Sequence, residues 1–411
     1  MPRVAILFDN FGPYHLARLS AASGVCNVMA VEFGSSSAEY DWKASETNGL
    51  QRVALNDRGS SRELSPEEFQ KRLFAVLDEF TPEAVVVPGW GYRGSLLALR
   101  WGLSHRVPVI CMSESTQWDE VRKPIKEFIK RRIIGLFSSA LVGGTPHRAY
   151  IQELGIPADR IFLGYDIIDN DYFEKGARVA QHAGFSASKP YFLASARFIE
   201  KKNLQRLLRA YALYRRKVES RESRVEGIDS GFRSQVSSLP DPFDLVLLGD
   251  GALRAELEKL RSELGLADCV QMPGFKQYEE LPFYYAHAGA FIHASTTEQW
   301  GLVVNEAMAS GLPVLVSNRC GCAADLVKEG ENGWTFDPID EEQIADLMLK
   351  IASDETRREA MGLKSREIIA EWGPDRFASG VKAAVEAALA APRKNAGLLD
   401  WLILKVLRSK R

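Results

Sequence analysis

Two glutamates of this 411-residue chain have the type and spacing to recognise hydroxyl groups. Glu298 and Glu306, with seven residues between them, lie around the expected start of a helix. Glu298 follows a strand predicted at Ala290–His293, and Gly311 and Pro313 are typical of a helix end. Carboxylates repel phosphate but accept hydrogen bonds from hydroxyls. The pair therefore suits two sets of hydroxyl groups, one on a sugar and the other on a ribose. A lone pair of this kind is more often two solvated helix residues; here the strand and the helix end favour a binding site.

The backbone between these glutamates predicts a phosphate site. Trp300, Gly301 and Leu302 stand at the expected helix start, where N–H groups have no partner within the helix. Such a terminus attracts anions, and open α/β sheets bind ligands at the carboxyl ends of their strands. We therefore expect these N–H groups to face a ligand.

A basic pair, Arg197 and Lys202, follows a strand predicted at Tyr191–Ser195. The planar guanidinium fork and the compact ammonium charge can together neutralise a diphosphate. A basic cluster before a helix is usually solvated surface, but its place at the head of a second α/β domain favours a binding role.

These motifs, taken in order, carry a family resemblance. The stretch from Glu298 to Val314 resembles the E-x7-E signature of the retaining GT-B glycosyltransferases of the family 4 (group 1) type, and Ser195–Asn203 is similar to that family's phosphate motif. The matching segments run from about residue 160 to residue 340. The resemblance implies two facing Rossmann-like domains with a cleft between them, the second domain holding a nucleotide-sugar donor.

Two weaker matches extend the resemblance. Gly249 and Gly251 are similar to the family's glycine turn, where small residues let ligand and backbone approach closely, although turn geometry alone also favours glycine. Gly274 and Phe275 are similar to the segment that faces the nucleotide base in the family. A Phe275 packed in the core is an equal alternative.

The first domain departs from the family pattern. Asn10–His15 stands where members commonly carry a glycine pair, and Ser113–Ser115 stands where they carry a histidine. His15 either contacts the acceptor or acts as a base, or else caps or packs its helix. Glu114 either binds acceptor hydroxyls or complements a helix dipole.

Two series of alternating strands and helices must position these residues. In the first, helices such as 66–80 and 93–105 separate strands expected at Val4–Phe8, Val28–Phe33, Ala84–Pro88, Val107–Met112 and Ala140–Gly143. In the second, helices near 203–216, 252–264 and 301–310 separate strands expected at Tyr191–Ser195, Phe243–Gly249, Val270–Pro273, Ala290–His293 and Val314–Ser317. This alternation predicts an α/β fold with parallel sheets.

A polar stretch at 174–190 interrupts the alternation and predicts a domain boundary. We expect an N-terminal acceptor-binding domain at 1–175 and a C-terminal donor-binding domain at 188–374. The Ser-, Arg- and Glu-rich stretch 219–241 predicts a mobile insertion, and two helices are expected within 375–411.

Composition limits the partners and the compartment. Lys+Arg 52 nearly balances Asp+Glu 54, so no global charge favours nucleic acid. The five cysteines fit neither a disulfide framework nor a zinc site, and no leader or spanning segment is visible, which together favour the cytoplasm.

The implied reaction moves a sugar from a UDP or GDP donor to a hydroxyl of a saccharide or lipid-linked acceptor, with retention if the family mechanism holds. No cofactor or metal is expected, because Arg197, Lys202 and the helix start already oppose the diphosphate charge. The alternatives are a sugar-nucleotide epimerase or phosphorylase of the same fold, and a non-catalytic sugar-nucleotide-binding protein.

Two segments predict attachment to the inner face of an anionic cell membrane. In helix 120–137, seven apolar residues share one side, while Lys123, Lys126 and Lys130 lie opposite and Arg132 intrudes. The apolar residues are Val121, Ile125, Phe128, Ile129, Ile133, Leu136 and Phe137. Segment 397–408 is apolar with a basic end, Arg408–Arg411, which suits an interfacial helix. A C-terminal helix packed on the first domain is the alternative.

Overall fold

The computed structural model describes residues 1–35, 49–57, 59–182, 189–226 and 242–407. The chain forms two compact units, and each is described by itself. Unit 1 comprises Met1–Asp169 and Trp372–Arg411, and unit 2 comprises Asn170–Glu371.

Unit 1 is built on a parallel sheet that has seven strands within the described residues, in the order β3-β2-β1-β4-β5-β6-β7. The strands are β1 Arg3–Phe8, β2 Asn27–Glu32, β3 Gln51–Ala54, β4 Ala84–Pro88, β5 Val109–Ser113, β6 Ser139–Val142 and β7 Ile161–Leu163. The helices are α1 Pro13–Ser23, α2 Pro66–Phe80, α3 Arg93–His105, α4 Pro124–Ile134, α5 Thr145–Leu154, α15 Pro374–Ala390 and α16 Leu398–Leu407.

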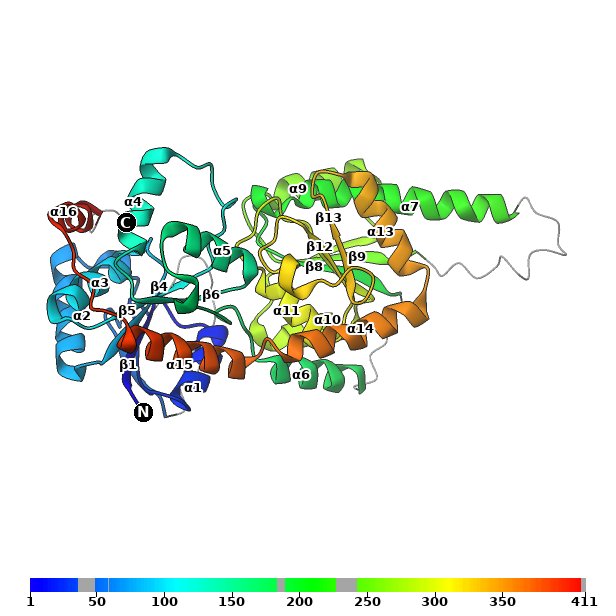
Figure 1. Ribbon diagram of the computed structural model, residues 1–411. Helices are drawn as coiled ribbons and strands as arrows, with labels where there is room; N and C mark the ends of the chain where they lie inside the picture. Colours follow the sequence, from blue (N-terminus) through cyan, green and yellow to red (C-terminus); the bar gives the residue numbers. More distant parts are fainter. Residues whose placement is uncertain (36–48, 58, 183–188, 227–241, 408–411) are drawn as a thin grey trace. The chain divides into compact units, whose positions relative to one another are not determined.

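Both faces of this sheet are covered, as its apolar strands predict. In β1, Val4 and Ile6 belong to the core under α1 and α15, while Ala5 and Leu7 belong to the core under α2 and α3. The two C-terminal helices cover opposite faces of the sheet. Helix α15 contributes to the first of these cores, and Leu404 of α16 lies in the second. Figure 1 shows α15 beside α1, and α16 beside α3.

Unit 2 repeats the architecture with a parallel sheet of six strands within the described residues, in the order β10-β9-β8-β11-β12-β13. The strands are β8 Tyr191–Ser195, β9 Asp244–Leu248, β10 Val270–Gly274, β11 Ala290–His293, β12 Val314–Ser317 and β13 Gly333–Phe336. The helices are α6 Asn170–His182, α7 Leu204–Glu226, α9 Arg254–Glu263, α10 Leu281–His287, α11 Leu302–Ala309, α12 Ala323–Leu326, α13 Glu341–Ala352 and α14 Glu355–Ala370.

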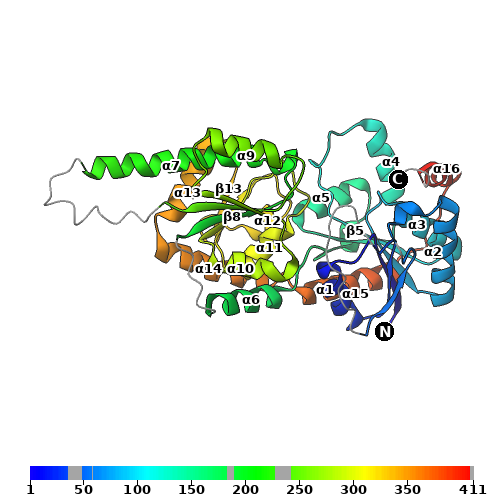
Figure 2. The ribbon, with the colours of Figure 1, turned by 180° about the vertical axis from the view of Figure 1, so that it is seen from behind.

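The order of the strands defines where a ligand can bind in unit 2. From β8 the chain builds outward through β9 and β10, then returns to place β11 on the other side of β8. Helices α7, α9 and α13 share a core on one face of the sheet, and α6, α10 and α11 pack together on the other (Figure 2). A reversal of this kind leaves a crevice outside the carboxyl ends of the two central strands, here β8 and β11.

Three local expectations differ from the structure. Residues 170–182 form α6, where an interruption is expected from residue 174, because Phe173 and Ala177 bury one helical face. Helix α7 continues to Glu226, so the first part of the expected insertion at 219–241 is helical, and residues 227–241 lie outside the described residues. Strands β3, β7 and β13 were not among the expected strands, and none of the four residues of β3 is fully buried.

Candidate functional site

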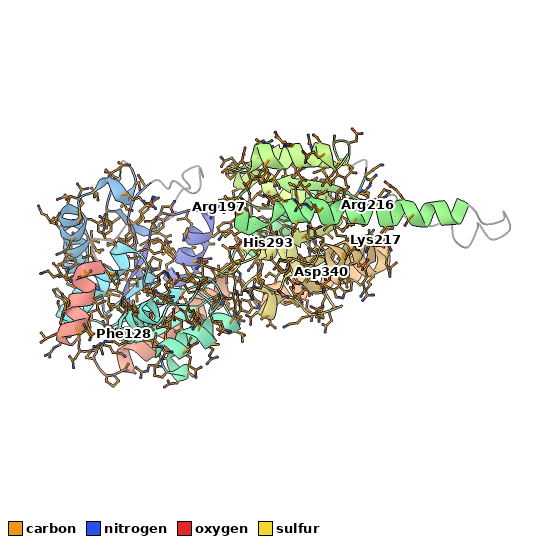
Figure 3. All side chains as sticks on the ribbon, turned by 90° about the horizontal axis from the view of Figure 1, so that it is seen from above. Phe128, Arg197, Arg216, Lys217, His293 and Asp340 are labelled. Atoms are coloured by element: carbon orange, nitrogen blue, oxygen red, sulfur yellow. The ribbon has the colours of Figure 1, made fainter. Side chains whose placement is uncertain are left out.

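The predicted donor residues of unit 2 gather at the carboxyl ends of β8 and β11. Arg197 and Lys202 follow β8, and Glu298 follows β11, so all three lie on the two strands that border the topological reversal. Figure 3 labels Arg197 and His293, which mark these two strand ends.

The Gly249 turn shapes the loop that carries Arg197. Ala196 donates a backbone hydrogen bond to Leu248 (3.0 Å), and Phe198 donates one to Asp250 (2.8 Å). Gly249 has φ +122°, and a Cβ there would lie 1.9 Å from the Ala196 carbonyl oxygen. Gly251 is equally confined, because its Cβ would lie 2.7 Å from the carbonyl oxygen of Phe198. The atoms that come close to these glycines in the structure are backbone atoms of the Arg197 loop, which fits the turn geometry that the sequence left as the alternative to a close ligand.

Asn203 ties the β8 loop to the β11 loop, and sequence reasoning did not identify it. It has φ +59° after the 3-10 turn Glu200–Lys202, a conformation that asparagine tolerates better than most residues. Its buried side-chain amide donates to the carbonyls of Ala294 (3.0 Å) and Pro338 (2.7 Å). The backbone N–H of Thr296 also donates to the carbonyl of Lys201 (2.9 Å). These bonds bring Lys202 to Glu298.

Lys202 and Glu298 form an ion pair through Nζ and Oε2. Both side chains are only 12% exposed, and the ammonium of Lys201 lies 3.8 Å from the other carboxylate oxygen, Oε1. The group predicted to bind diphosphate therefore neutralises the charge of the group predicted to bind sugar.

His293 and Ser295 complete the surroundings of Glu298. His293 Nε2 lies 3.5 Å from Glu298 Oε2, and Ser295 Oγ lies 3.4 Å from the same oxygen. Burial alone would raise the pKa of the Glu298 carboxyl, but the His293 hydrogen bond and the Lys202 charge outweigh it and hold that pKa well below its usual range. Glu298 is therefore a carboxylate at neutral pH.

Glu306 occupies a different environment from Glu298. Its side chain is 1% exposed, and Tyr285 of α10 donates its hydroxyl to Oε2 at 2.7 Å. Burial, followed by the nearby Glu306 carboxylate, raises the pKa of Tyr285 well above its usual value, so the tyrosine keeps its proton and remains a donor. Tyr285 could have been found only from the structure, because it lies 21 residues from Glu306 in the chain.

The start of α11 matches the expected helix boundary. Gly301 is the N-cap with φ +105°, and Leu302 is the first helical residue. The Trp300 indole is buried and donates to the Asn305 side chain at 2.9 Å, so any role of Trp300 in binding falls to its backbone. That this terminus binds phosphate stays a prediction.

Phe275 is 42% exposed, so it is not a core residue. It follows Gly274, whose φ is +86° and whose missing side chain faces open space. Of the two alternatives left by the sequence, a ring available to stack on a base fits this exposure; a ligand contact remains a prediction.

In unit 1, His15 caps α1. Its Nδ1 accepts the backbone N–H of Gly12 at 3.1 Å, and its ring packs edge-on against Phe8. Burial, helped by the Arg18 charge, lowers the pKa of His15 to about 3. The imidazole is therefore neutral at physiological pH and a very weak base.

Glu114 belongs to a buried polar cluster after β5. It hydrogen-bonds the carboxyl of Asp166, whose pKa is raised well above its usual value, first by burial and then by the Glu114 charge. Asp166 also faces Arg18, with 3.5 Å between Oδ1 and the guanidinium. Asp166 is fully buried beside the buried Arg18.

Over the described residues, no group of three or more His, Cys, Asp or Glu side chains is arranged to hold a metal ion. Within that same part of the chain, no helix combines the length and the apolar character needed to cross a bilayer.

Comparisons with known proteins assign the second unit to a family. Residues 178–368 match the family model described as glycosyl transferases group 1. The chain is 35% identical over 138 residues to a sulfoquinovosyl transferase of Arabidopsis thaliana. It is 33% identical over 143 residues to a GDP-mannose-dependent alpha-(1-6)-phosphatidylinositol monomannoside mannosyltransferase of Mycobacterium tuberculosis. Each alignment covers 33% of this chain, but only 26% and 37% of the relatives' own lengths.

Solved structures share the fold over nearly the whole chain. Anabaena HepE in complex with UDP matches with a TM-score of 0.68 at 15% identity, covering 93% of this chain and 98% of that one. Sucrose-phosphate synthase from Thermosynechococcus elongatus matches with a TM-score of 0.67 at 19% identity, covering 93% and 97%.

Residues 178–368 are a group 1 glycosyltransferase domain, on a chain with the GT-B fold. The predicted fold class is thereby confirmed, and the predicted family is confirmed for residues 178–368. The expectation of an enzyme of this class agrees with the transferases among the relatives.

Proposed function

We propose that this protein is a glycosyltransferase that moves a sugar from a nucleoside diphosphate to a hydroxyl of a saccharide or lipid-linked acceptor. The observation that carries the proposal is the convergence of Lys202 and Glu298 at the ends of β8 and β11. A cation beside a carboxylate matches a ligand that carries a diphosphate next to a sugar.

Arg197, Lys202 and the start of α11 stabilise the charge that develops on the leaving diphosphate. The bond between the anomeric carbon and the diphosphate oxygen breaks, a bond forms to the acceptor oxygen, and the acceptor proton passes to an oxygen of the leaving diphosphate. Of the two candidates in unit 1 for acceptor contact, His15 is already engaged as a helix cap, because its Nδ1 accepts the backbone N–H of Gly12. We therefore assign acceptor contact to Glu114, and we propose retention of anomeric configuration by family analogy.

Glu306 and Phe275 take the nucleoside in this proposal, through the ribose hydroxyls and the base. UDP is supported by its presence in the HepE structure, and GDP by the donor named for the mycobacterial relative. No observation favours the epimerase, the phosphorylase or the non-catalytic binder over the transferase.

Turnover of a donor panel tests the proposal. Release of UDP or GDP from a set of sugar nucleotides, measured with and without saccharide and lipid-linked acceptors, should show one donor whose nucleotide release depends on an acceptor. A single epimerised sugar nucleotide with no release would favour the epimerase. Binding without any turnover would favour the non-catalytic protein.

We further propose that unit 1 attaches to the inner face of the cell membrane through the α4–α16 surface. This surface is the exposed apolar set Val121, Ile125, Phe128, Leu398, Leu399, Leu402 and Val406. Ile125 is 76% and Leu398 92% exposed, and Phe128 is labelled in Figure 3. Arg132, which interrupts the apolar side in sequence, binds Asp400 at 2.6 Å and so joins the two helices.

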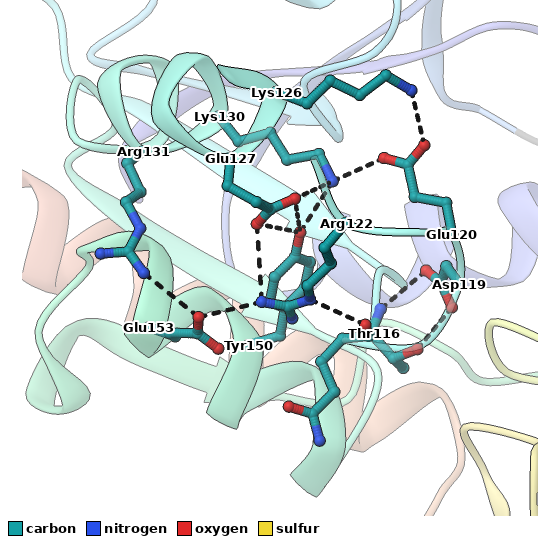
Figure 4. A network of polar contacts seen from close by, with 11 residues as sticks. Thr116, Asp119, Glu120, Arg122, Lys126, Glu127, Lys130, Arg131, Tyr150 and Glu153 are labelled. Carbon is teal, nitrogen blue, oxygen red and sulfur yellow. Dashed lines mark hydrogen bonds and ion pairs between the residues drawn. The ribbon is translucent and has the colours of Figure 1, made fainter. Parts of the chain in front are cut away.

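The structure corrects the expected apolar face and its charges. Ile133, Leu136 and Phe137 are buried in unit 1, and Ile129 packs against the same core, so only the outer part of the face can meet lipid. Lys126 and Lys130 are engaged by Glu120, and Lys130 also by Glu127 and Tyr150 (Figure 4). The basic end Arg408–Arg411 lies outside the described residues. Apolar insertion therefore contributes more than these lysines to the proposed attachment.

Co-sedimentation with phosphatidylglycerol vesicles tests the attachment. We expect the full chain to bind, and a double variant Ile125→Ser with Leu398→Ser to lose most of the binding, because both side chains leave water on insertion. Leu363→Ser, which changes another exposed apolar residue (66% exposed) but in unit 2, is the control. No binding by the full chain at low salt would refute the attachment.

A further inference from the structure

The Glu298 carboxylate is held asymmetrically, through one of its two oxygens. Oε2 faces the Lys202 ammonium, His293 Nε2 at 3.5 Å and Ser295 Oγ at 3.4 Å. For Oε1, the contact within ion-pair distance in the described residues is Lys201 Nζ at 3.8 Å. Oε1 is therefore the oxygen with room to accept a further hydrogen bond.

His293 and Ser295 belong to rigid parts of unit 2. His293 is the last residue of β11 and is paired in register with Val316 of β12, and its side chain is 2% exposed. Ser295 is fully buried two residues later, and its Oγ lies 3.3 Å from His293 Nε2. The sheet holds side chains near a buried strand end in place. The Lys202 ammonium, by contrast, is carried on a flexible four-carbon chain.

The protonation states suit a donor beside an acceptor. Burial lowers the pKa of His293, so its ring is neutral and carries one N–H. Because Glu298 is ionised, that proton belongs on Nε2, where it can be donated to Oε2. The ring thus contributes a hydrogen bond without adding a second full charge to the site.

We infer that His293 and Ser295 are positioning residues that fix Glu298 for recognition of the donor sugar. Under the proposed function, on which this inference rests, the diphosphate draws the Lys202 ammonium away from Glu298. His293 and Ser295 keep Oε2 in place during that exchange, so that Oε1 stays directed at a sugar hydroxyl. The pair would then set how strongly the enzyme discriminates between donors that differ in that hydroxyl.

The test compares binding of a sugar nucleotide with binding of its free nucleotide. UDP-glucose with UDP, and GDP-mannose with GDP, are titrated calorimetrically into the full chain and into His293→Ala, His293→Gln and Ser295→Ala. His147→Ala is the matched control, because His147 is another fully buried histidine that caps a helix in unit 1. A melting curve for each variant reports folding.

We expect His293→Ala to weaken sugar-nucleotide binding at least about tenfold while free-nucleotide binding changes by less than about twofold. Ser295→Ala should show a smaller split of the same kind. His293→Gln, whose amide can reach Oε2, should recover most of the loss, and His147→Ala should show no split.

Three results overturn the inference: equal loss of sugar-nucleotide and free-nucleotide binding in folded His293→Ala, no loss in either, or no recovery by His293→Gln. A wild-type chain that binds none of the four ligands would instead overturn the proposed function itself. The two failures are therefore distinguishable.

Discussion

The two glutamates of the E-x7-E stretch are alike in sequence and unlike in environment. Glu298 is an ion-paired carboxylate at a strand end, while Glu306 is buried against Tyr285. The spacing of the glutamates was visible in the sequence because it is local. Their partners His293 and Tyr285 were not identified, because a strand residue and a helix residue become neighbours of a carboxylate only through tertiary packing.

Tyr285→Phe tests the role of the tyrosine. It leaves Glu306 Oε2 buried without its hydroxyl donor, which costs about 1–3 kcal/mol in the free energy of unfolding. A carboxylate that is no longer oriented should also raise the KM for the donor. Steady-state kinetics and chemical unfolding measure the two effects.

Tyr191→Phe is the control, since the Tyr191 hydroxyl donates to a backbone carbonyl of unit 2, that of Tyr284, and not to Glu306. An equal rise in donor KM for both variants would show that Tyr285 acts only through the stability of the unit.

At the scale of elements, local patterns predicted most helices and strands, although α7 continues well beyond the expected residues 203–216. Helices α2 and α3 occupy the expected residues 66–80 and 93–105. A proline marks the start of α2, and apolar residues recur at helical spacing along α3. The glycine turn lies where it was expected, but the close approach of Ala196 to Gly249 was not predicted, because it joins two loops that are far apart in sequence. Asn203 gave a usable signal, as asparagine before a helix tolerates a positive φ.

The cap of α1 predicts a pH dependence of stability. The pKa of His15 is about 3 in the folded chain, against an ordinary value of 6.5. Between these values the unfolded chain binds a proton that the folded chain does not, so stability falls as the pH drops through this window. His15→Asn cannot take up that proton and should lose less stability over the same range.

Urea unfolding at several pH values between 3.5 and 7 measures this difference. His105→Asn, which changes a partly exposed histidine at the end of α3, is the control. Parallel loss of stability in wild type and His15→Asn would show that His15 titrates normally.

At the scale of the molecule, the alternation of strands and helices predicted two α/β sheets but not the exact division of the chain. The second unit begins at Asn170 and ends at Glu371, since α6 packs on α10 and α11, whereas 1–175 and 188–374 were expected. The sequence left two alternatives open for the C-terminal helices, packing on the first domain and contact with lipid. α16 does pack, through Leu404, and still exposes Leu398 and Leu402, a division that depends on the tertiary contacts of each residue.

Metal independence is a prediction for the whole enzyme. Arg197, Lys202 and the α11 terminus oppose the diphosphate charge, so acceptor-dependent nucleotide release should continue unchanged in excess EDTA. Assays before and after chelation, with Mg²⁺ or Mn²⁺ added back, measure this. Loss of turnover in EDTA and its recovery with either ion would mean that the cations of the chain are not sufficient.

The central claim is that Lys202 binds the diphosphate and Glu298 binds the sugar, and calorimetry tests it most directly. UDP or GDP and the matching sugar nucleotide are titrated into wild type, Lys202→Met and Glu298→Gln, with Lys201→Met, which lies farther from Glu298, as the control. We predict that Lys202→Met weakens both ligands by at least about tenfold, a loss of about 1.4 kcal/mol. Glu298→Gln should weaken only the sugar nucleotide, because it leaves Lys202 free for the diphosphate. Equal weakening of both ligands by Glu298→Gln, or unchanged binding by Lys202→Met, would contradict the account.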